Sequence, residues 1–157
     1  MEYDLKARRP AQAAAGLNLE KGNVMPINYL AVVVAAVAGF ALGWGWYTVF
    51  GKAWMAALGK SKEDCDKEKQ SPMPLIIAGV SCFLMAWMLA GLMGHLSDVT
   101  VKGGVVSAIF VWIGFVLTTI ATNHAFEGMR PMVTAIDAGH WLAVLVLMGA
   151  IIGAFGV

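Results

Sequence analysis

The sequence predicts an all-α protein, a four-helix transmembrane bundle with antiparallel helices and short loops. Each of four apolar runs is long enough to cross about 30 Å of hydrocarbon, since a helix needs about 20 residues to do so. The composition agrees, with 59% hydrophobic residues, 13% charged residues and a mean hydropathy of +0.72. A soluble chain of 157 residues has no core large enough for that much apolar surface. The four runs are Ile27 to Phe50, Pro74 to His95, Gly103 to Thr122 and Met132 to Val157.

Ahead of the first run, residues 1–24 form a polar tail, and residues 25–157 form the transmembrane domain. The tail carries Lys6, Arg8 and Arg9 beside an alanine-rich stretch, and it has no apolar face that would order it alone. The apolar run that follows is too long for the core of a signal peptide. We therefore expect this run to be retained as the first membrane helix.

The segment between the first and second runs predicts a second, shorter helix followed by a loop. Phe50, Trp54 and Leu58 recur every four residues, as in an amphipathic helix that lies along the membrane surface. Residues 60–69 alternate in charge and are expected to form a solvated loop. Pro74 then favours the start of the second membrane helix, since proline suits a first helical turn.

Small residues recur along every predicted membrane helix. Helices in lipid associate through close packing, and small residues at four-residue spacing let two backbones approach. We therefore predict a compact bundle. Its helix contacts are expected at Ala35, Gly39 and Gly43 in the first helix, Ala86 and Ala90 in the second, Gly114 in the third, and Gly149 and Gly153 in the fourth.

Polar residues gather where the third helix ends and the fourth begins: His124, Glu127, Arg130, Asp137 and His140. A three-residue spacing places His124 beside Glu127, and Asp137 beside His140. We interpret the cluster as a polar latch, in which Glu127 meets Arg130 or His124 while Asp137 meets His140. The alternative is a metal site of two imidazoles and two carboxylates, which would suit zinc, iron or manganese. We expect no metal and no catalytic residue.

His95 ends the second run, four residues after Gly91. A small residue one turn before a histidine leaves room for a macrocycle, so haem or chlorophyll is the alternative to a histidine that binds nothing. We expect no cofactor. Cys65 and Cys82 are expected to be free thiols, because no metal-ligand spacing joins them. The net charge of +1, without a basic stripe, indicates no nucleic-acid partner.

Several short motifs resemble those of a known family. They include Asn28-Tyr29-Leu30, Trp46-Tyr47, Phe126-Glu127-Gly128, Asp137-Ala138-Gly139-His140 and Met148-Gly149-Ala150. From about Asn28 to its end, the chain is similar to small bacterial membrane proteins grouped as domain of unknown function 1761 (DUF1761). The resemblance implies a four-helix bacterial membrane protein, and it implies no assigned activity.

Two functional hypotheses are compatible with these patterns. The first is a non-catalytic accessory or scaffold subunit of a larger membrane complex, respiratory or photosynthetic, with other membrane subunits and lipids as its partners. The alternative is a small oligomeric transporter or proton-handling protein that uses the polar cluster as a pocket. No nucleophile elbow or phosphate loop appears, so we expect no enzyme. We place the chain in the bacterial inner membrane with loops 51–73 and 127–131 in the cytoplasm, where positive charges lie near helix ends.

Overall fold

The computed structural model describes residues 27–61 and 71–156. The predicted tail, Cys65 and most of the predicted loop 60–69 lie outside the described residues. Four helical spans are long and apolar enough to cross a membrane, namely Tyr29–Leu58, Met73–His95, Val101–Phe126 and Pro131–Phe155. The described residues contain no strand. The prediction of an all-α fold with four transmembrane helices is confirmed.

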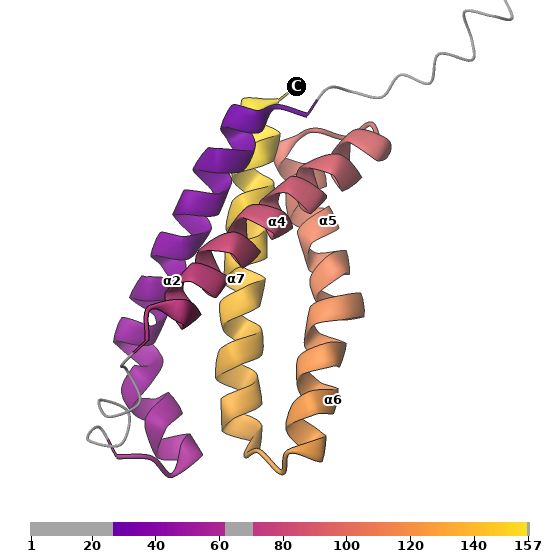
Figure 1. Ribbon diagram of the computed structural model, residues 1–157. Helices are drawn as coiled ribbons and strands as arrows, with labels where there is room; N and C mark the ends of the chain where they lie inside the picture. The colour runs from indigo at the N-terminus through magenta and orange to yellow at the C-terminus, as the bar shows by residue number, and fades with distance from the viewer. Residues whose placement is uncertain (1–26, 62–70, 157) are drawn as a thin grey trace, which may run out of the picture.

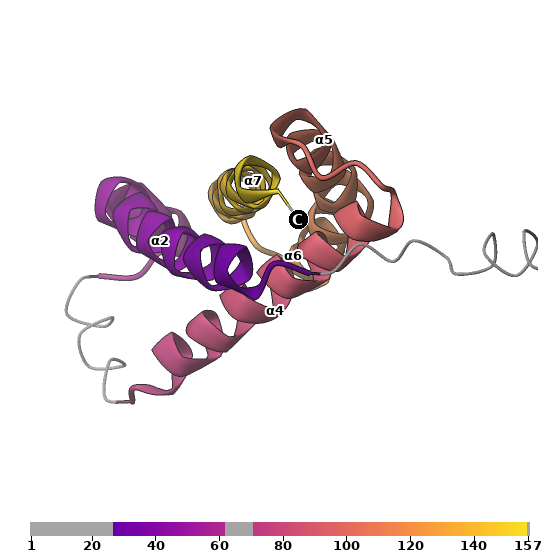
Figure 2. The same ribbon diagram turned by 90° about the horizontal axis from the view of Figure 1, so that it is seen from above.

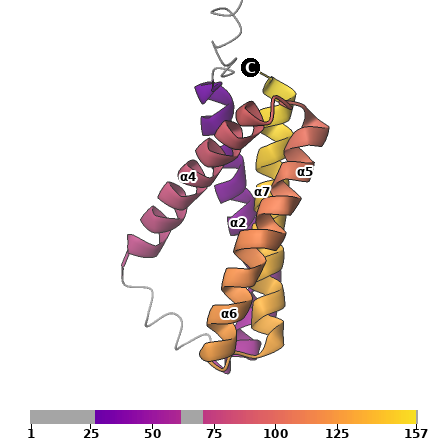
Figure 3. The same ribbon diagram turned by 90° about the vertical axis from the view of Figure 1, so that its right-hand side faces the viewer.

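The fourth span, α7 (Pro131–Phe155), is the centre of the molecule. It lies between α2 (Tyr29–Leu58) on one side and α5 (Val101–Val111) on the other, as Figures 1 and 2 show. The second span, α4 (Met73–His95), crosses one face of this layer diagonally, and its N-terminal half leans away from the other helices (Figure 3). The N-terminal half of α4 is therefore separated from the other helices.

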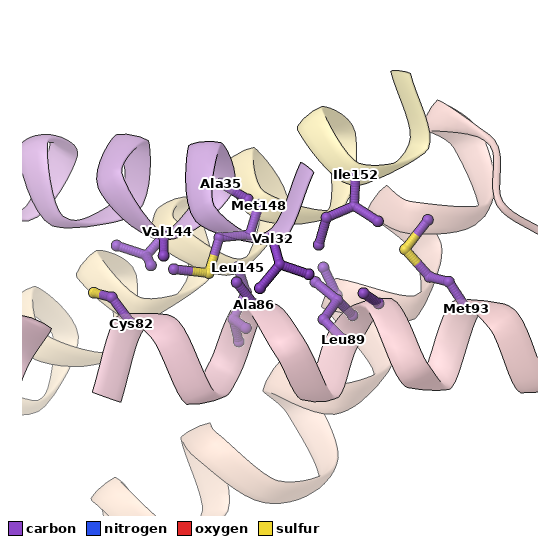
Figure 4. Packing of buried hydrophobic residues seen from close by; sticks show 13 residues of the cluster. Val32, Ala35, Cys82, Ala86, Leu89, Met93, Val144, Leu145, Met148 and Ile152 are labelled. Carbon is purple, nitrogen blue, oxygen red and sulfur yellow. The ribbon is translucent and has the colours of Figure 1, made fainter. Parts of the chain in front are cut away.

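Apolar side chains from α2, α4 and α7 form the core (Figure 4). Ala35, Ala86 and Ala90 are buried there, as predicted. These small residues alternate with larger ones, so the helices interdigitate without a bulky layer between them. The larger buried members are Val32, Leu89, Met93, Val144, Leu145, Met148 and Ile152.

Glycines let α7 approach its neighbours closely. A Cβ added to Gly149 would collide with the backbone of Gly104 on α5, and a Cβ added to Gly153 would collide with the backbone of Thr100. We call these four residues the glycine contact. On the α2 side, Gly39 leaves room for the end of the Met148 side chain. The predicted contacts at Gly39, Gly149 and Gly153 are confirmed.

The predicted surface helix is wrong, because α2 continues without interruption to Leu58. Nothing between Phe50 and Leu58 breaks a helix as proline would, and the helix ends only at Gly59, whose φ of 69° is left-handed. At 30 residues, α2 is about 45 Å long, well beyond the 30 Å of hydrocarbon. A helix of this length tilts in the bilayer or extends beyond its core, and Phe50, Trp54 and Leu58 lie in its last turns.

The third span contains a π-helical segment. Three segments follow one another along it: α5, η1 (Trp112–Leu117) and α6 (Thr118–Phe126). Neither η1 nor α6 contains a buried residue, and Gly114 is exposed with nothing within 4 Å of an added Cβ. The predicted contact at Gly114 is therefore wrong within this chain. A π-turn changes the helical phase, and the span diverges from α7 beyond it, so the stripe that includes Gly114 faces outward.

Candidate functional site

Three helices meet in a hydrogen-bonded group at the end where the third span turns into the fourth. Tyr47 of α2 donates from its hydroxyl to Asp137 Oδ1 at 2.7 Å. His124 of α6 lies with Nε2 3.9 Å from Asp137 Oδ2, and its Nδ1 lies 3.0 Å from the hydroxyl of Thr134. We call Tyr47, His124, Thr134 and Asp137 the polar network. It joins α2, α6 and α7 through side chains that lipid could not satisfy.

The network differs from the predicted latch in its pairing. Asp137 accepts a hydrogen bond from Tyr47 rather than from His140, although both α7 side chains lie near Tyr47 of α2, whose ring centre is 5.1 Å from that of His140. Glu127 and Arg130 are exposed at the turn. The Arg130 guanidinium donates over 3.5 Å to the Ala56 carbonyl near the end of α2. Within the described residues, no three His, Cys, Asp or Glu side chains lie together as ligands for a metal ion.

His140 has a different environment from the rest of the predicted cluster. Only 8% of it is exposed, and its Nε2 lies over Gly43, 2.8 Å from where a Cβ would stand. The imidazole ring centre lies 4.7 Å from that of Trp141 and 5.1 Å from that of Tyr47. Its Nδ1 is buried without a hydrogen-bond partner among the described residues. Gly43 is thus a contact position, as predicted, and the group that it accommodates is an imidazole.

A cavity of about 440 Å³ lies beside His140, where α4 leans away from α2 and α7. We call it the His140 cavity. Its walls are mainly aromatic and apolar, with two hydroxyl groups from Tyr47 and Thr48. Other lining residues are Phe40, Gly43, Trp44, Leu75, Cys82 and Trp141. The sequence has no signal for this cavity, because it depends on the tilt of α4 and on Gly43 and His140 facing each other.

A second hollow of about 520 Å³ lies between α7 and the segment η1–α6. Small side chains line much of it: Ala121 and Ala125 on α6, and Ala135, Ala138 and Gly139 on α7. We call it the alanine groove. At one end, the Trp112 indole N–H donates to the Ala138 carbonyl at 2.8 Å and holds η1 against α7.

His95 is the last residue of α4, one helical turn after Gly91. The histidine is exposed at the end of α4, and the Cδ1 atom of Ile27 lies 3.9 Å from where a Gly91 Cβ would stand. Cys82 is buried in α4 as a free thiol, as predicted.

Comparison with known proteins identifies the family. The model of a family described as a protein of unknown function (DUF1761) matches residues 30–153. That range includes nearly all of the four spans, the polar network, the alanine groove and the His140 cavity. Comparisons with curated proteins and with solved structures give no match. The chain therefore belongs to the DUF1761 family, as the motifs around Trp46-Tyr47 and Asp137 predict.

Proposed function

We propose that this protein is a non-catalytic accessory subunit of a larger membrane complex, and that a transmembrane helix of another subunit packs into its alanine groove. The observation that carries the proposal is the groove itself. Small side chains of two helices line it, and no other described helix of this chain fills it.

The chemistry of the groove favours a helix over a lipid chain as its occupant. Helices in lipid gain little from apolar contact alone and associate where small residues let backbones approach. Ala121 and Ala125 are four residues apart on α6, and Ala135 and Gly139 are four apart on α7. Both walls therefore present the spacing that admits a partner backbone. The same half of the third span has no buried residue in this chain, so a partner would supply its packing.

The polar network supports a structural role for the titratable groups. Tyr47, His124 and Asp137 are bonded or paired to one another across three helices. Side chains engaged in this way fasten α2 and α6 to α7. We expect these side chains to stabilise the helix packing and to keep α6 and α7 in the positions that form the alanine groove.

A groove-filling variant tests this proposal. Ala125→Leu combined with Ala135→Leu would occupy the groove, while Ala41→Leu places the same side chain on an exposed position of α2 as a control. Chains extracted from native membranes in mild detergent are sized, and a photo-crosslinker at Ala121 identifies the neighbouring helix. We expect the wild type and the control to elute as a larger complex and to crosslink to a neighbouring helix. The double variant should elute at a smaller size and give no crosslink. A monomeric wild type, or a double variant that keeps its partner, would overturn the proposal.

The polar network also favours a second candidate, a small proton-handling protein. His124 and Asp137 are titratable groups 3.9 Å apart, and Tyr47 extends the chain of groups to α2. Four helices seldom enclose a pathway alone, so this function requires an oligomer. Proton flux into vesicles should then disappear in Asp137→Asn and persist in Glu127→Gln, whose side chain is exposed at the turn. Vesicles without flux for the wild type would exclude this candidate.

We also propose that the host complex is respiratory or photosynthetic and that the membrane is the bacterial inner membrane. In this proposal, the C-terminal end of α2, the segment that follows it to residue 73, and the turn 127–131 face the cytoplasm. A cysteine introduced at Glu127 should react with an impermeant maleimide in inverted vesicles and not in spheroplasts. Labelling in spheroplasts would show that the chain has the opposite orientation.

A further inference from the structure

We infer that the His140 cavity binds a neutral, membrane-soluble compound with a flat ring that carries a carbonyl or hydroxyl oxygen, the chemistry of a quinone. The ring would lie among the aromatic walls, and its oxygen would bond the imidazole of His140. This inference does not depend on the proposed function, because the cavity and the alanine groove are lined by different residues of α7, with α2 and α4 beside the cavity and η1–α6 beside the groove.

The unpartnered imidazole is the first observation behind this inference. His140 is only 8% exposed, it lines the cavity, and its Nδ1 has no hydrogen-bond partner among the described residues. An unpaired polar atom at such a place is unfavourable, and lipid offers no substitute partner. A neutral imidazole has one donor nitrogen and one acceptor nitrogen, so it bonds a carbonyl as readily as a hydroxyl.

The size and the walls of the cavity indicate a ring. Its volume of about 440 Å³ falls in the range of small-molecule sites, roughly 300–1,000 Å³. Phe40, Trp44 and Trp141 contribute aromatic surface, against which a flat ring packs in offset or edge-on contact. None of the lining residues is a lysine, arginine, aspartate or glutamate. A neutral compound therefore suits the cavity better than a charged one.

The tilt of α4 indicates where the compound enters. Leu75, Ala78 and Cys82 of α4 form one wall of the cavity, and this half of α4 leans away from α2 and α7 (Figure 3). Trp44 on α2 is 67% exposed and also lines the cavity. All of these residues belong to helices that are apolar enough to cross a membrane, so we expect the opening to face lipid. A compound that partitions into the bilayer reaches it from the side.

Tryptophan fluorescence tests the inference, because Trp44 and Trp141 line the cavity. The purified full chain in nanodiscs is titrated with decylubiquinone, a quinone with a short tail. We expect decylubiquinone to quench the tryptophan fluorescence of the wild type in a saturable manner. Gly43→Ala places a Cβ 2.8 Å from His140 Nε2 and should weaken binding at least about tenfold. Gly45→Ala is the matched control, since nothing lies within 4 Å of its added Cβ, and it should bind like the wild type.

A second variant separates binding from folding. His140→Phe keeps an aromatic ring and removes both nitrogens, and we expect about tenfold weaker binding with the helix content unchanged. Trp44→Phe should reduce the amplitude of quenching and leave the dissociation constant within about twofold. If Gly43→Ala lowers the melting temperature, the quinone affinities of His140→Phe and Gly45→Ala decide whether His140 takes part in binding.

Three outcomes would overturn the inference. Quenching that does not saturate and is equal in all variants would show general partition into the membrane. Recovery of the quenched fluorescence when dodecanol is added at a concentration similar to that of decylubiquinone would show a cleft for lipid chains. Unchanged affinity in His140→Phe would show that the imidazole takes no part. Loss of the subunit partner in the groove-filling experiment would leave each of these results unaffected.

Discussion

The two ends of the helical layer differ in how their helices are held together. At the end where α5 begins, the backbones of α5 and α7 touch directly at the glycine contact, and Met93, Met148 and Ile152 fill the space beside it. At the other end, α4 and α6 diverge from α7, and side-chain hydrogen bonds replace backbone packing. The buried polar atoms without partners among the described residues, on Trp46, Trp54 and His140, lie toward this second end. Close packing stabilises the first end, and the second end retains space and unsatisfied polar groups, which is where the proposed ligand and the proposed partner helix would bind.

The largest effect is expected at the glycine contact. In Gly149→Ala, the new methyl group collides with the Gly104 backbone, which moves only if a whole helix shifts. We expect a loss of about 1–3 kcal/mol in the free energy of unfolding, measured by reversible unfolding in mixed micelles. Gly51→Ala, with nothing within 4 Å of its added Cβ, is the control. Equal stability of the two variants would mean that α5 and α7 are not packed backbone to backbone.

The next effect is expected in the polar network. Asp137→Ala removes the acceptor of the Tyr47 hydroxyl and the partner of His124, and we expect a loss of about 1–2 kcal/mol. Combined with Tyr47→Phe in a double-mutant cycle, it should give a coupling of about 0.6–1.7 kcal/mol. Additive losses would show that the 2.7 Å hydrogen bond contributes nothing to stability.

A smaller effect is expected where η1 meets α7. Trp112→Phe keeps the aromatic packing and removes the indole N–H that donates to Ala138. We expect a loss of about 0.6 kcal/mol, the average value for such a bond in a membrane. Hydrogen exchange of the amides of η1 should rise in parallel. Exchange that rises equally in α5 would contradict a local role for this bond.

The smallest effect is expected at Gly114, with the opposite sign. Because nothing surrounds an added Cβ, Gly114→Ala should raise the free energy of unfolding by about 0.5 kcal/mol through the greater helix propensity of alanine. The same unfolding assay measures it in the isolated chain. A loss of stability there would reveal a contact of Gly114 within the chain.

The membrane spans could be predicted from the sequence, because their length and apolar composition follow directly from the thickness of a bilayer. Close contacts at Gly39, Gly149 and Gly153 were also predictable, because small residues mark the helix faces that approach one another. The prediction failed at Gly114, because a π-turn between Trp112 and Leu117 alters the direction that the following residues face. Periodicity alone does not reveal such a turn.

The candidate site was predictable only in part. The position of Asp137 and His124 near one end follows from the alternating direction of the spans, and the structure brings these two side chains together. The contacts of Asp137 with Tyr47 and of His140 with Gly43 could not be predicted, because Tyr47 and Gly43 lie on a helix about 90 residues away in sequence. Which face of α2 meets α7 is decided by packing along the whole helix, and a single sequence contains no measure of it.

The central position of α7 has a consequence for biosynthesis. The helices that flank it, α2 and α5, hardly touch each other, and both pack mainly against α7, which follows them in the chain. A nascent chain that has released α2, α4 and α5 into the membrane therefore has no central element around which to assemble. Until α7 is inserted, the glycine faces of α5 and α2 remain open to chaperones and membrane proteases. Maturation of this protein is thus set by the arrival of one late segment, and stalled translation before Pro131 would leave a substrate for quality control.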